Sequence, residues 1–230
     1  MLPRIALTAG FAAAAVSAGD ISARFADSYT FFQGDGSATA GWPSEAAWGT
    51  YQQLFDANKG LMEKSCGFNG WGADNSPAEI ASIDSAIRQV AQESGVDNRA
   101  ILAVVMQESK GCVRVPTTDN GVRNPGLMQS HNGQGSCAGV NPCPPAQILQ
   151  MIRDGVTGTP FGPGIQGTIA QAKTLTGDSG ARAVYTGARI YNSGSATVTN
   201  LDDGRGSTVC YAADIANRLT GWTLSPSACH

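Results

Sequence analysis

Several features of common protein classes are scarce or missing in this chain of 230 residues. Lysine and arginine number 15 against 18 acidic residues, and they form no cluster. The net charge is −3, and nucleic-acid binding depends on basic patches. Only two histidines and no Cys-x-x-Cys pair occur, which argues against a zinc site. We expect a monomer that binds no metal, with neither nucleic acid nor a membrane as a partner.

The N-terminus has the pattern of a cleaved signal peptide. Arg4 supplies a positive start, residues 5–15 are apolar, and the segment VSA at 16–18 ends in small residues. The apolar stretch of about 11 residues is too short to cross a bilayer, and no later stretch is long enough. We therefore expect residues 1–18 to be a signal peptide and the protein to be secreted.

All six cysteines follow the expected signal peptide, which predicts three disulfides in an oxidising compartment. Six cysteines allow fifteen pairings, and the sequence alone does not choose among them. One arrangement closes a short loop through Cys137–Cys143 and ties the C-terminal tail to the last helix through Cys210–Cys229. It leaves Cys66–Cys112 to fasten the N-terminal region.

Capping signals and apolar periodicity predict a mainly α-helical single domain with a small β element. The clearest start signal is the capping box SPAE at 76–79, and Gly95 is the matching stop. Asp97 is expected to cap the next helix, 98–109, whose AILAVVM body is apolar on every side and therefore enclosed. Further helices are expected at 44–65, 144–155, 164–176, 180–192 and 208–220.

Two segments are expected to be irregular. Residues 19–43 show no clear period and are expected to lie over the core. Residues 111–142 are rich in Gly, Pro, Asn and Asp and predict a long loop. Within this loop we expect a short β-hairpin around Val113–Val115 and Gly126–Gln129.

Glu108 stands out as a lone carboxylate at the end of the enclosed helix 98–109. Partial desolvation raises the pKa of a carboxyl group. A carboxylic acid that is still protonated near neutral pH can donate a proton to a glycosidic oxygen. Position alone does not establish this role, because a glutamate at a helix end more often faces solvent.

Three short motifs follow one another between residues 95 and 195. They are Glu108-Ser109 within GVDNRAILAVVMQESKG, the GLMQ of NPGLMQS at 126–129, and Tyr191-Asn192 within ARIYNSG. In this order they resemble the lytic transglycosylase and goose-type lysozyme superfamily, with Ile190 in place of the usual alanine. The residues before about 75 match nothing in that pattern.

The resemblance implies a lysozyme-like α+β fold, with a catalytic domain over 76–230 and an N-terminal extension over 19–75 packed on the core. It implies a secreted muramidase that needs no cofactor and hydrolyses the β-1,4 bond between N-acetylmuramic acid and N-acetylglucosamine in bacterial peptidoglycan. Glu108 would be the general acid, and Tyr191 would lie over the site. The substrate-binding positions would be Ser109, Gly126, Met128, Gln129, Tyr191 and Asn192, each of which has a purely structural alternative.

Asp119 is the candidate for a catalytic base. It lies eleven residues after Glu108 and seven before Gly126, close to where goose-type enzymes place an aspartate that helps a water to attack. The alternative is an Asx-turn within TTDNG. A second acid follows the GLMQ motif in many goose-type relatives, but Ser130-His131 occupies that place here. We expect hydrolysis with inversion, and a lytic transglycosylase that leaves 1,6-anhydro ends is the alternative.

Other activities fit parts of the sequence. The acidic balance would suit a chitinase or chitosanase acting on related amino-sugar polymers, although charge affects encounter rate more than chemistry. A wall-binding protein without turnover is an alternative from another class, and the intact Glu108 argues against it. The GPGIQG segment at 162–167 matches a dinucleotide-binding pattern, but no predicted strand precedes it.

Overall fold

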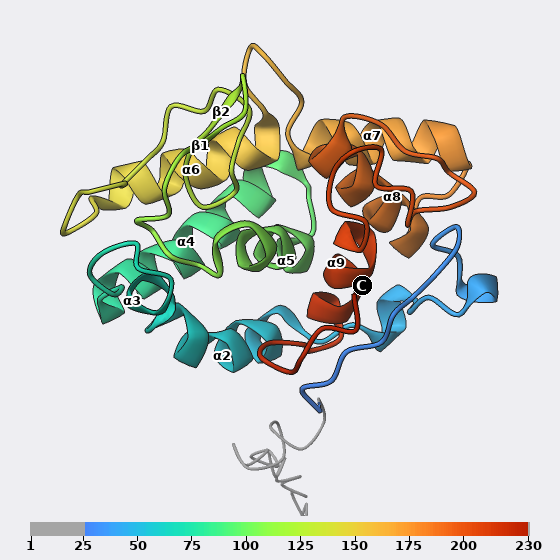
Figure 1. The fold of residues 1–230 in the computed structure, drawn as a ribbon, viewed down its shortest axis with the longest axis horizontal. Helices are drawn as coiled ribbons and strands as arrows, with labels where there is room; N and C mark the ends of the chain where they lie inside the picture. Colours follow the sequence, from blue (N-terminus) through green and yellow to red (C-terminus); the bar gives the residue numbers. More distant parts are fainter. Residues whose placement is uncertain (1–25, 230) are drawn as a thin grey trace, which may run out of the picture.

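Helix α5 (Asn98–Ser109) lies at the centre of the computed structural model, which describes residues 26–229 (Figure 1). Its body from Ala100 to Met106 is wholly buried. A helix that is apolar all round needs partners on every side. They are supplied by α2 (Tyr51–Met62), α4 (Pro77–Ser94) and α9 (Tyr211–Leu219). The predicted enclosed helix is therefore confirmed.

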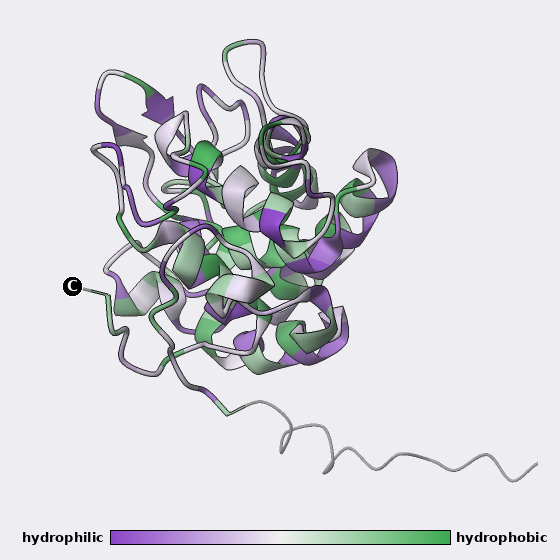
Figure 2. Cartoon of the chain, turned by 90° about the vertical axis from the view of Figure 1, so that its right-hand side faces the viewer, coloured by the Kyte–Doolittle hydropathy of each residue, from purple (hydrophilic) through white to green (hydrophobic). Residues whose placement is uncertain are grey.

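The described residues form one mainly helical domain with eight α-helices and a two-stranded antiparallel sheet. The remaining helices are α3 (Ser65–Phe68), α6 (Pro145–Thr157), α7 (Ile165–Thr176) and α8 (Ala181–Ser193). Helix α6 packs on α4, and α7 packs on α8 (Figure 1). Figure 2 shows the apolar residues gathered between the helices and the polar residues on the outward faces. The predicted fold class is confirmed, whereas residues 1–18 lie outside the described range.

The start and stop signals of α4 act as the sequence predicts. Ser76 Oγ accepts a hydrogen bond from the backbone amide of Glu79, whose carboxylate in turn accepts from the amide of Ser76. Gly95 ends the helix with a φ of 73°, in the left-handed region that glycine adopts without a steric penalty. Local capping chemistry therefore fixes both ends of this helix.

The predicted helix over 44–65 is wrong at its start. Residues Glu45–Ala47 form only a 3-10 turn, and Trp48 is extended, with a ψ of 147°. The α-helix begins at Tyr51, because Thr50 and Gln53 form a capping box that places the helix start there. Trp48 is still buried, but it packs from an extended segment.

The β element is confirmed, but its predicted position is wrong. Strands β1 (Thr118–Asp119) and β2 (Arg123–Asn124) pair antiparallel. Gly121, with a φ of 87°, supplies the left-handed residue of a three-residue hairpin loop. The GLMQ segment at 126–129 is instead a tight turn, because its first and last residues have φ angles of 76° and 46°.

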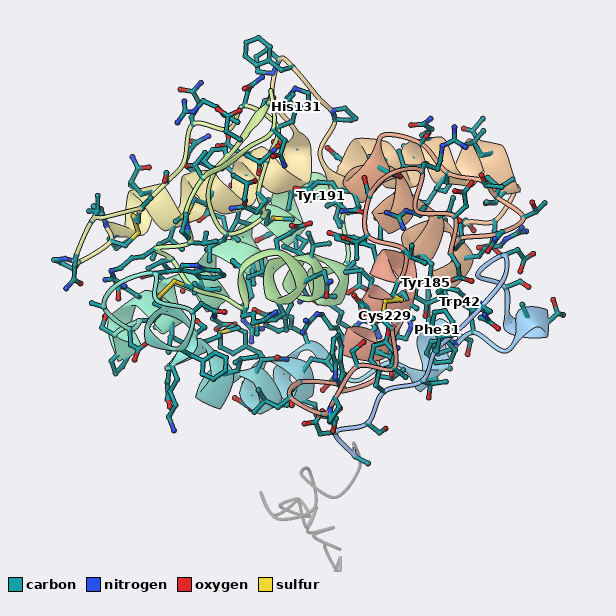
Figure 3. All side chains as sticks on the ribbon, in the orientation of Figure 1. Phe31, Trp42, His131, Tyr185, Tyr191 and Cys229 are labelled. Carbon is teal, nitrogen blue, oxygen red and sulfur yellow. A yellow bond between two sulfur atoms is a disulfide. The ribbon has the colours of Figure 1, made fainter. Side chains whose placement is uncertain are left out.

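Residues 26–43 have little regular structure and lie across α8 and α9 (Figure 1). Tyr29 donates its hydroxyl to Asp214 at 2.7 Å, on α9. Trp42 packs against Tyr185, with ring centroids 5.2 Å apart, and both are part of the main hydrophobic core. In Figure 3 these two residues lie together with Phe31, away from Tyr191 and His131. The early segment therefore helps to hold the helix that carries part of the site.

Three disulfides connect distant parts of the described chain: Cys66–Cys112, Cys137–Cys143 and Cys210–Cys229. This is the arrangement considered from the sequence, and no free cysteine occurs among the described residues. Each such bond stabilises a fold by about 2–4 kcal/mol, and disulfides persist in oxidising compartments. In the described range, no helix is both long and apolar enough to span a membrane.

Candidate active site

Glu108 lies on the last turn of α5, with its side chain half-buried. Burial raises the pKa of Glu108 to about 7. A hydrogen bond from Tyr211 and the positive charges of Arg218 and Lys110 act in the opposite direction and limit the rise. A carboxyl group with this pKa is protonated in a large fraction of molecules at neutral pH, as a general acid requires.

Tyr211, on the first turn of α9, is the direct partner of Glu108. Its hydroxyl donates to Glu108 Oε1 at 2.5 Å. Burial and the nearby Glu108 charge raise the pKa of Tyr211 well above its usual range, so the phenol stays a donor. The role of Tyr211 cannot be predicted from the sequence, because no local pattern connects it with a glutamate 103 positions earlier.

Tyr191 is close enough for the Glu108 charge to act on its pKa, but its hydroxyl binds elsewhere. It donates to the backbone carbonyl oxygen of Met128 at 2.8 Å. Burial, and then the Glu108 charge, raise the pKa of Tyr191. Tyr191 therefore connects α8 with the GLMQ turn, next to Glu108.

Ser109 joins α5 to the GLMQ turn. Its Oγ lies 2.8 Å from the carbonyl oxygen of Leu127 and 3.0 Å from that of Val105. The serine is completely buried, so these contacts replace water as its hydrogen-bond partners. The predicted Glu-Ser pair thus divides its roles: Glu108 is half-open to solvent, and Ser109 is internal.

Close backbone packing shapes the GLMQ turn. A Cβ at Gly126 would lie 2.6 Å from Met151 Cγ, and a Cβ at Gly155 on α6 would lie 2.4 Å from Met128 Cβ. Gly135 is as tight, because its Cβ would lie 2.4 Å from the Met151 amide nitrogen. Met128 is completely buried, and its carbonyl oxygen already accepts a hydrogen bond from Tyr191.

The Gln129 side chain holds the hairpin to the turn. Its Oε1 accepts from Thr118 Oγ1 at 2.9 Å, and its Nε2 donates to the carbonyl oxygens of Pro116 and Gly126 at 3.2 and 3.1 Å. This amide therefore already has protein partners for both of its ends. Any direct contact with a ligand would compete with these bonds.

Asn192 is oriented by a buried arginine. Arg189 is completely buried, and its Nη2 donates to Asn192 Oδ1. Because a guanidinium can only donate, it fixes which end of the amide faces it. The Nδ2 donors of Asn192 are left for other partners. Sequence analysis misses Arg189, which lies three residues before Asn192 on the same helix.

Arg189 also contacts the start of α9. Its Nη1 donates to the carbonyl oxygens of Thr208 and Val209 at 2.5 and 3.2 Å, and its guanidinium lies 5.8 Å from the Tyr211 ring centroid. Among the residues that the structure describes, it forms no ion pair. Burying an unpaired charge is costly, so we attribute its placement to these positioning contacts.

A pocket of about 310 Å³ opens beside Tyr191 and Asn192. Much of its wall is polar without formal charge, and His131 is one of the lining residues. Small-ligand sites combine a concave shape with a few well-placed polar groups. The polar side chains that line it are Asn124, Gln129, His131, Thr168, Gln171, Tyr191 and Asn192. A larger cavity of about 570 Å³ lies elsewhere, between the N-terminal segment and the α7–α8 turn.

Asp119 is placed on the exposed strand β1. Its Oδ1 accepts from the amide of Gly121 at 3.0 Å, which is the Asx-turn that the sequence left as an alternative. The charged groups that act on the pKa of Glu108 are Arg218 and Lys110. The structure therefore brings Asp119 to the hairpin and not into contact with the Tyr211–Glu108 pair.

A buried network supports the other side of Glu108. Asp214 on α9 accepts from Tyr29 and from Gln107 Nε2, the latter at 2.8 Å. Arg218 Nε donates to Gln107 Oε1 at 2.8 Å. Lys110, directly after the Glu108-Ser109 pair, is half-buried in the field of these charges. This side of the site is therefore cationic around Glu108.

The part of the chain that the structure describes contains no group of three His, Cys, Asp or Glu side chains arranged to hold a metal ion. Comparison with models of known protein families and with curated proteins found no match for this chain. Its function is therefore inferred from the site itself.

Proposed function

We propose that this protein is a secreted, monomeric muramidase that cleaves the β-1,4 bond between N-acetylmuramic acid and N-acetylglucosamine in peptidoglycan. The observation that carries the proposal is Glu108, a half-buried carboxyl group with a pKa raised to about 7 and a direct hydrogen bond from Tyr211. The sequence motifs around Glu108, the GLMQ turn and Tyr191-Asn192 support it. The expected signal peptide and the three disulfides support secretion.

In this proposal, protonated Glu108 gives its proton to the glycosidic oxygen. The bond between that oxygen and the sugar C1 breaks, its electron pair goes to the oxygen, and the leaving sugar departs as an alcohol. Positive charge develops on C1, and Glu108 becomes an anion. Tyr211, Arg218 and Lys110 stabilise this anion, as their lowering effects on its pKa indicate.

The neutral pocket and the cationic side of the site support a polymer with N-acetyl groups and carboxylates. The Nδ2 donors of Asn192 suit an N-acetyl carbonyl oxygen. Lys110, which is only half-buried, suits the lactyl or peptide carboxylates of peptidoglycan and disfavours a cationic chitosan chain, whereas Arg218 is buried and acts on Glu108 from within the fold. Peptidoglycan is therefore preferred over chitosan despite the acidic net charge of the protein.

The sugar cation then needs a nucleophile. In hydrolysis, a water adds to C1 and gives its proton to a base, for which we propose Asp119. The Asx-turn at Asp119 favours a second candidate function, the lytic transglycosylase. In that reaction the 6-hydroxyl of the muramic acid adds to C1 and gives its proton to the Glu108 carboxylate, no water is consumed, and a 1,6-anhydro ring is formed.

One assay tests the proposal. Purified protein is incubated with bacterial walls, chitin and chitosan, and the products are identified by mass spectrometry, with Glu108→Gln as the control. We expect cleavage of the walls, and loss of activity in the variant by about 10²-fold or more. If the protein cleaves chitin or chitosan but not bacterial walls, the substrate proposed here is wrong and the cleaved polymer takes its place. Activity within threefold of wild type in Glu108→Gln, or wall binding without products, would overturn the proposal.

A further inference from the structure

Phe161 is an exposed aromatic residue that directly precedes two residues of the pocket beside Asn192. It lies between α6 and α7, and 62% of its surface is exposed. The two residues that follow it, Gly162 and Pro163, line the pocket. A single exposed apolar side chain needs no explanation by itself. Phe161 differs from other exposed apolar residues because the turn that carries it is held by hydrogen bonds and close packing.

The turn that carries Phe161 is fastened on both sides. Thr159 and Gly162 exchange backbone hydrogen bonds at 3.0 and 3.3 Å. Thr159 Oγ1 donates to the His131 carbonyl oxygen at 2.7 Å and accepts from the Phe161 amide at 3.2 Å. The ring is therefore presented on a turn that is tied to the segment following GLMQ.

The base of this turn is closed by backbone packing. A Cβ at Gly164 would lie 2.3 Å from the Val156 carbonyl oxygen, and a Cβ at Gly158 would lie 2.5 Å from the Gly164 amide nitrogen. Gly162 lies against the His131 ring, where a Cβ would be 3.0 Å from Nδ1. Little freedom remains for the turn to fold back and bury Phe161.

An aromatic face beside amide donors suits a pyranose ring. The C–H groups of one sugar face carry slight positive charge, and the face of an aromatic ring is its electron-rich side. The hydroxyl and N-acetyl groups at the sugar edge find polar partners such as Asn192, Gln171 and Asn124 in the pocket wall. We propose that Phe161 is a stacking platform for an N-acetylhexosamine ring of the polymer, next to the part of the pocket lined by Gly162 and Pro163.

This inference rests on the proposed function, and it is tested by binding in the inactive Glu108→Gln background. Isothermal titration with the trimer and hexamer of N-acetylglucosamine compares Phe161→Ala, Phe161→Trp and the control Phe68→Ala. Phe68 is 83% exposed on α3 and does not line the pocket. We expect Phe161→Ala to weaken hexamer binding about tenfold. Phe161→Trp should keep the affinity and change its fluorescence on binding, and Phe68→Ala should have no effect.

The outcomes separate the two proposals. Equal hexamer affinity in Phe161→Ala and its parent overturns the stacking platform, whether or not the wild type cleaves walls. Binding that depends on Phe161 in a protein that cleaves no polymer supports the platform and overturns the proposed reaction. Absence of hexamer binding in every variant overturns the platform as well.

Discussion

The hydroxyl of Tyr211 lies 2.5 Å from Glu108 Oε1 and connects the first turn of α9 with the last turn of α5. The tyrosine donates to the ionised acid and so stabilises the product of proton transfer, whereas burial favours the protonated form. The pKa of Glu108 is the balance of burial against the Tyr211 hydrogen bond and the charges of Arg218 and Lys110. The two sides of this balance can be altered separately by mutation.

The pKa of Glu108 makes the stability of the protein depend on pH. An ordinary glutamate has a pKa of 4.5, and the native value is about 7. Between these values the native state binds more protons than the unfolded state, so this contribution is full below pH 4.5 and is lost as pH rises through 7. Relative to wild type, Glu108→Gln should therefore gain up to about 3 kcal/mol of stability between pH 4.5 and 8. Urea denaturation of both proteins at several pH values checks this, and a constant difference would contradict it.

Replacing Tyr211 by phenylalanine removes the donor to Glu108 and should raise its pKa further. We expect Tyr211→Phe to lower kcat about tenfold and to shift the basic limb of the pH–rate profile upward. Tyr185→Phe is the matched control, because that buried hydroxyl donates to the Pro43 carbonyl oxygen at 2.8 Å. The control should lose some stability and keep its pH profile. An unshifted profile in Tyr211→Phe would show that the tyrosine is only structural.

Asn192→Asp gives the buried Arg189 a carboxylate partner and removes the amide donors from the pocket. We expect the melting temperature to rise by about 2–4 °C, from roughly 1 kcal/mol of added pairing. The KM for wall fragments should rise by about fivefold to tenfold, with little change in kcat. Asn120→Asp, at an exposed position of the hairpin loop, controls for the added charge. A lower melting temperature in Asn192→Asp would argue against the Arg189 contact.

The role of Asp119 is decided by the products. If it is the base, Asp119→Asn should slow the formation of reducing muramic acid ends at least tenfold. Asp178→Asn is a matched control, because Asp178 accepts from the Gly180 amide in the same kind of turn, at 2.7 Å. If the main products are lighter by one water than fragments with reducing ends, the enzyme is a lytic transglycosylase. Asp119 would then be a turn residue only.

Local signals in the sequence account for much of the helical framework. The Ser76–Glu79 capping box, the Gly95 stop and the Asp97 cap each depend on residues within one turn, and each is found where it was predicted. Only the start of the helix predicted over 44–65 is wrong, because the capping box of Thr50 and Gln53, another local signal, places the first turn at Tyr51. The predicted position of the hairpin is wrong because residues 111–142 contain two glycine turns, at Gly121 and at Gly126, and the sequence does not show which one joins the strands.

The site itself was predicted only in part. Glu108, Ser109 and Tyr191 belong to short motifs, and the structure brings them together around the GLMQ turn. Tyr211 and Arg189 were missed, because their roles depend on contacts of α9 with two other helices. Nothing in a linear pattern reports that a tyrosine after Cys210 meets a glutamate on α5.

The glycines that pack against the GLMQ turn have a consequence for how variants of this protein would be interpreted. Gly126, Gly135 and Gly155 each lie where a Cβ would come within 2.6 Å of another atom. A saturation mutagenesis screen would therefore score them as intolerant as Glu108, although their role is to leave room for neighbouring backbone and methionine side-chain atoms. In such a screen, loss of fitness would be as strong at these packing positions as at a residue proposed to take part in the reaction. Only a separate measurement of folded protein would tell the two apart.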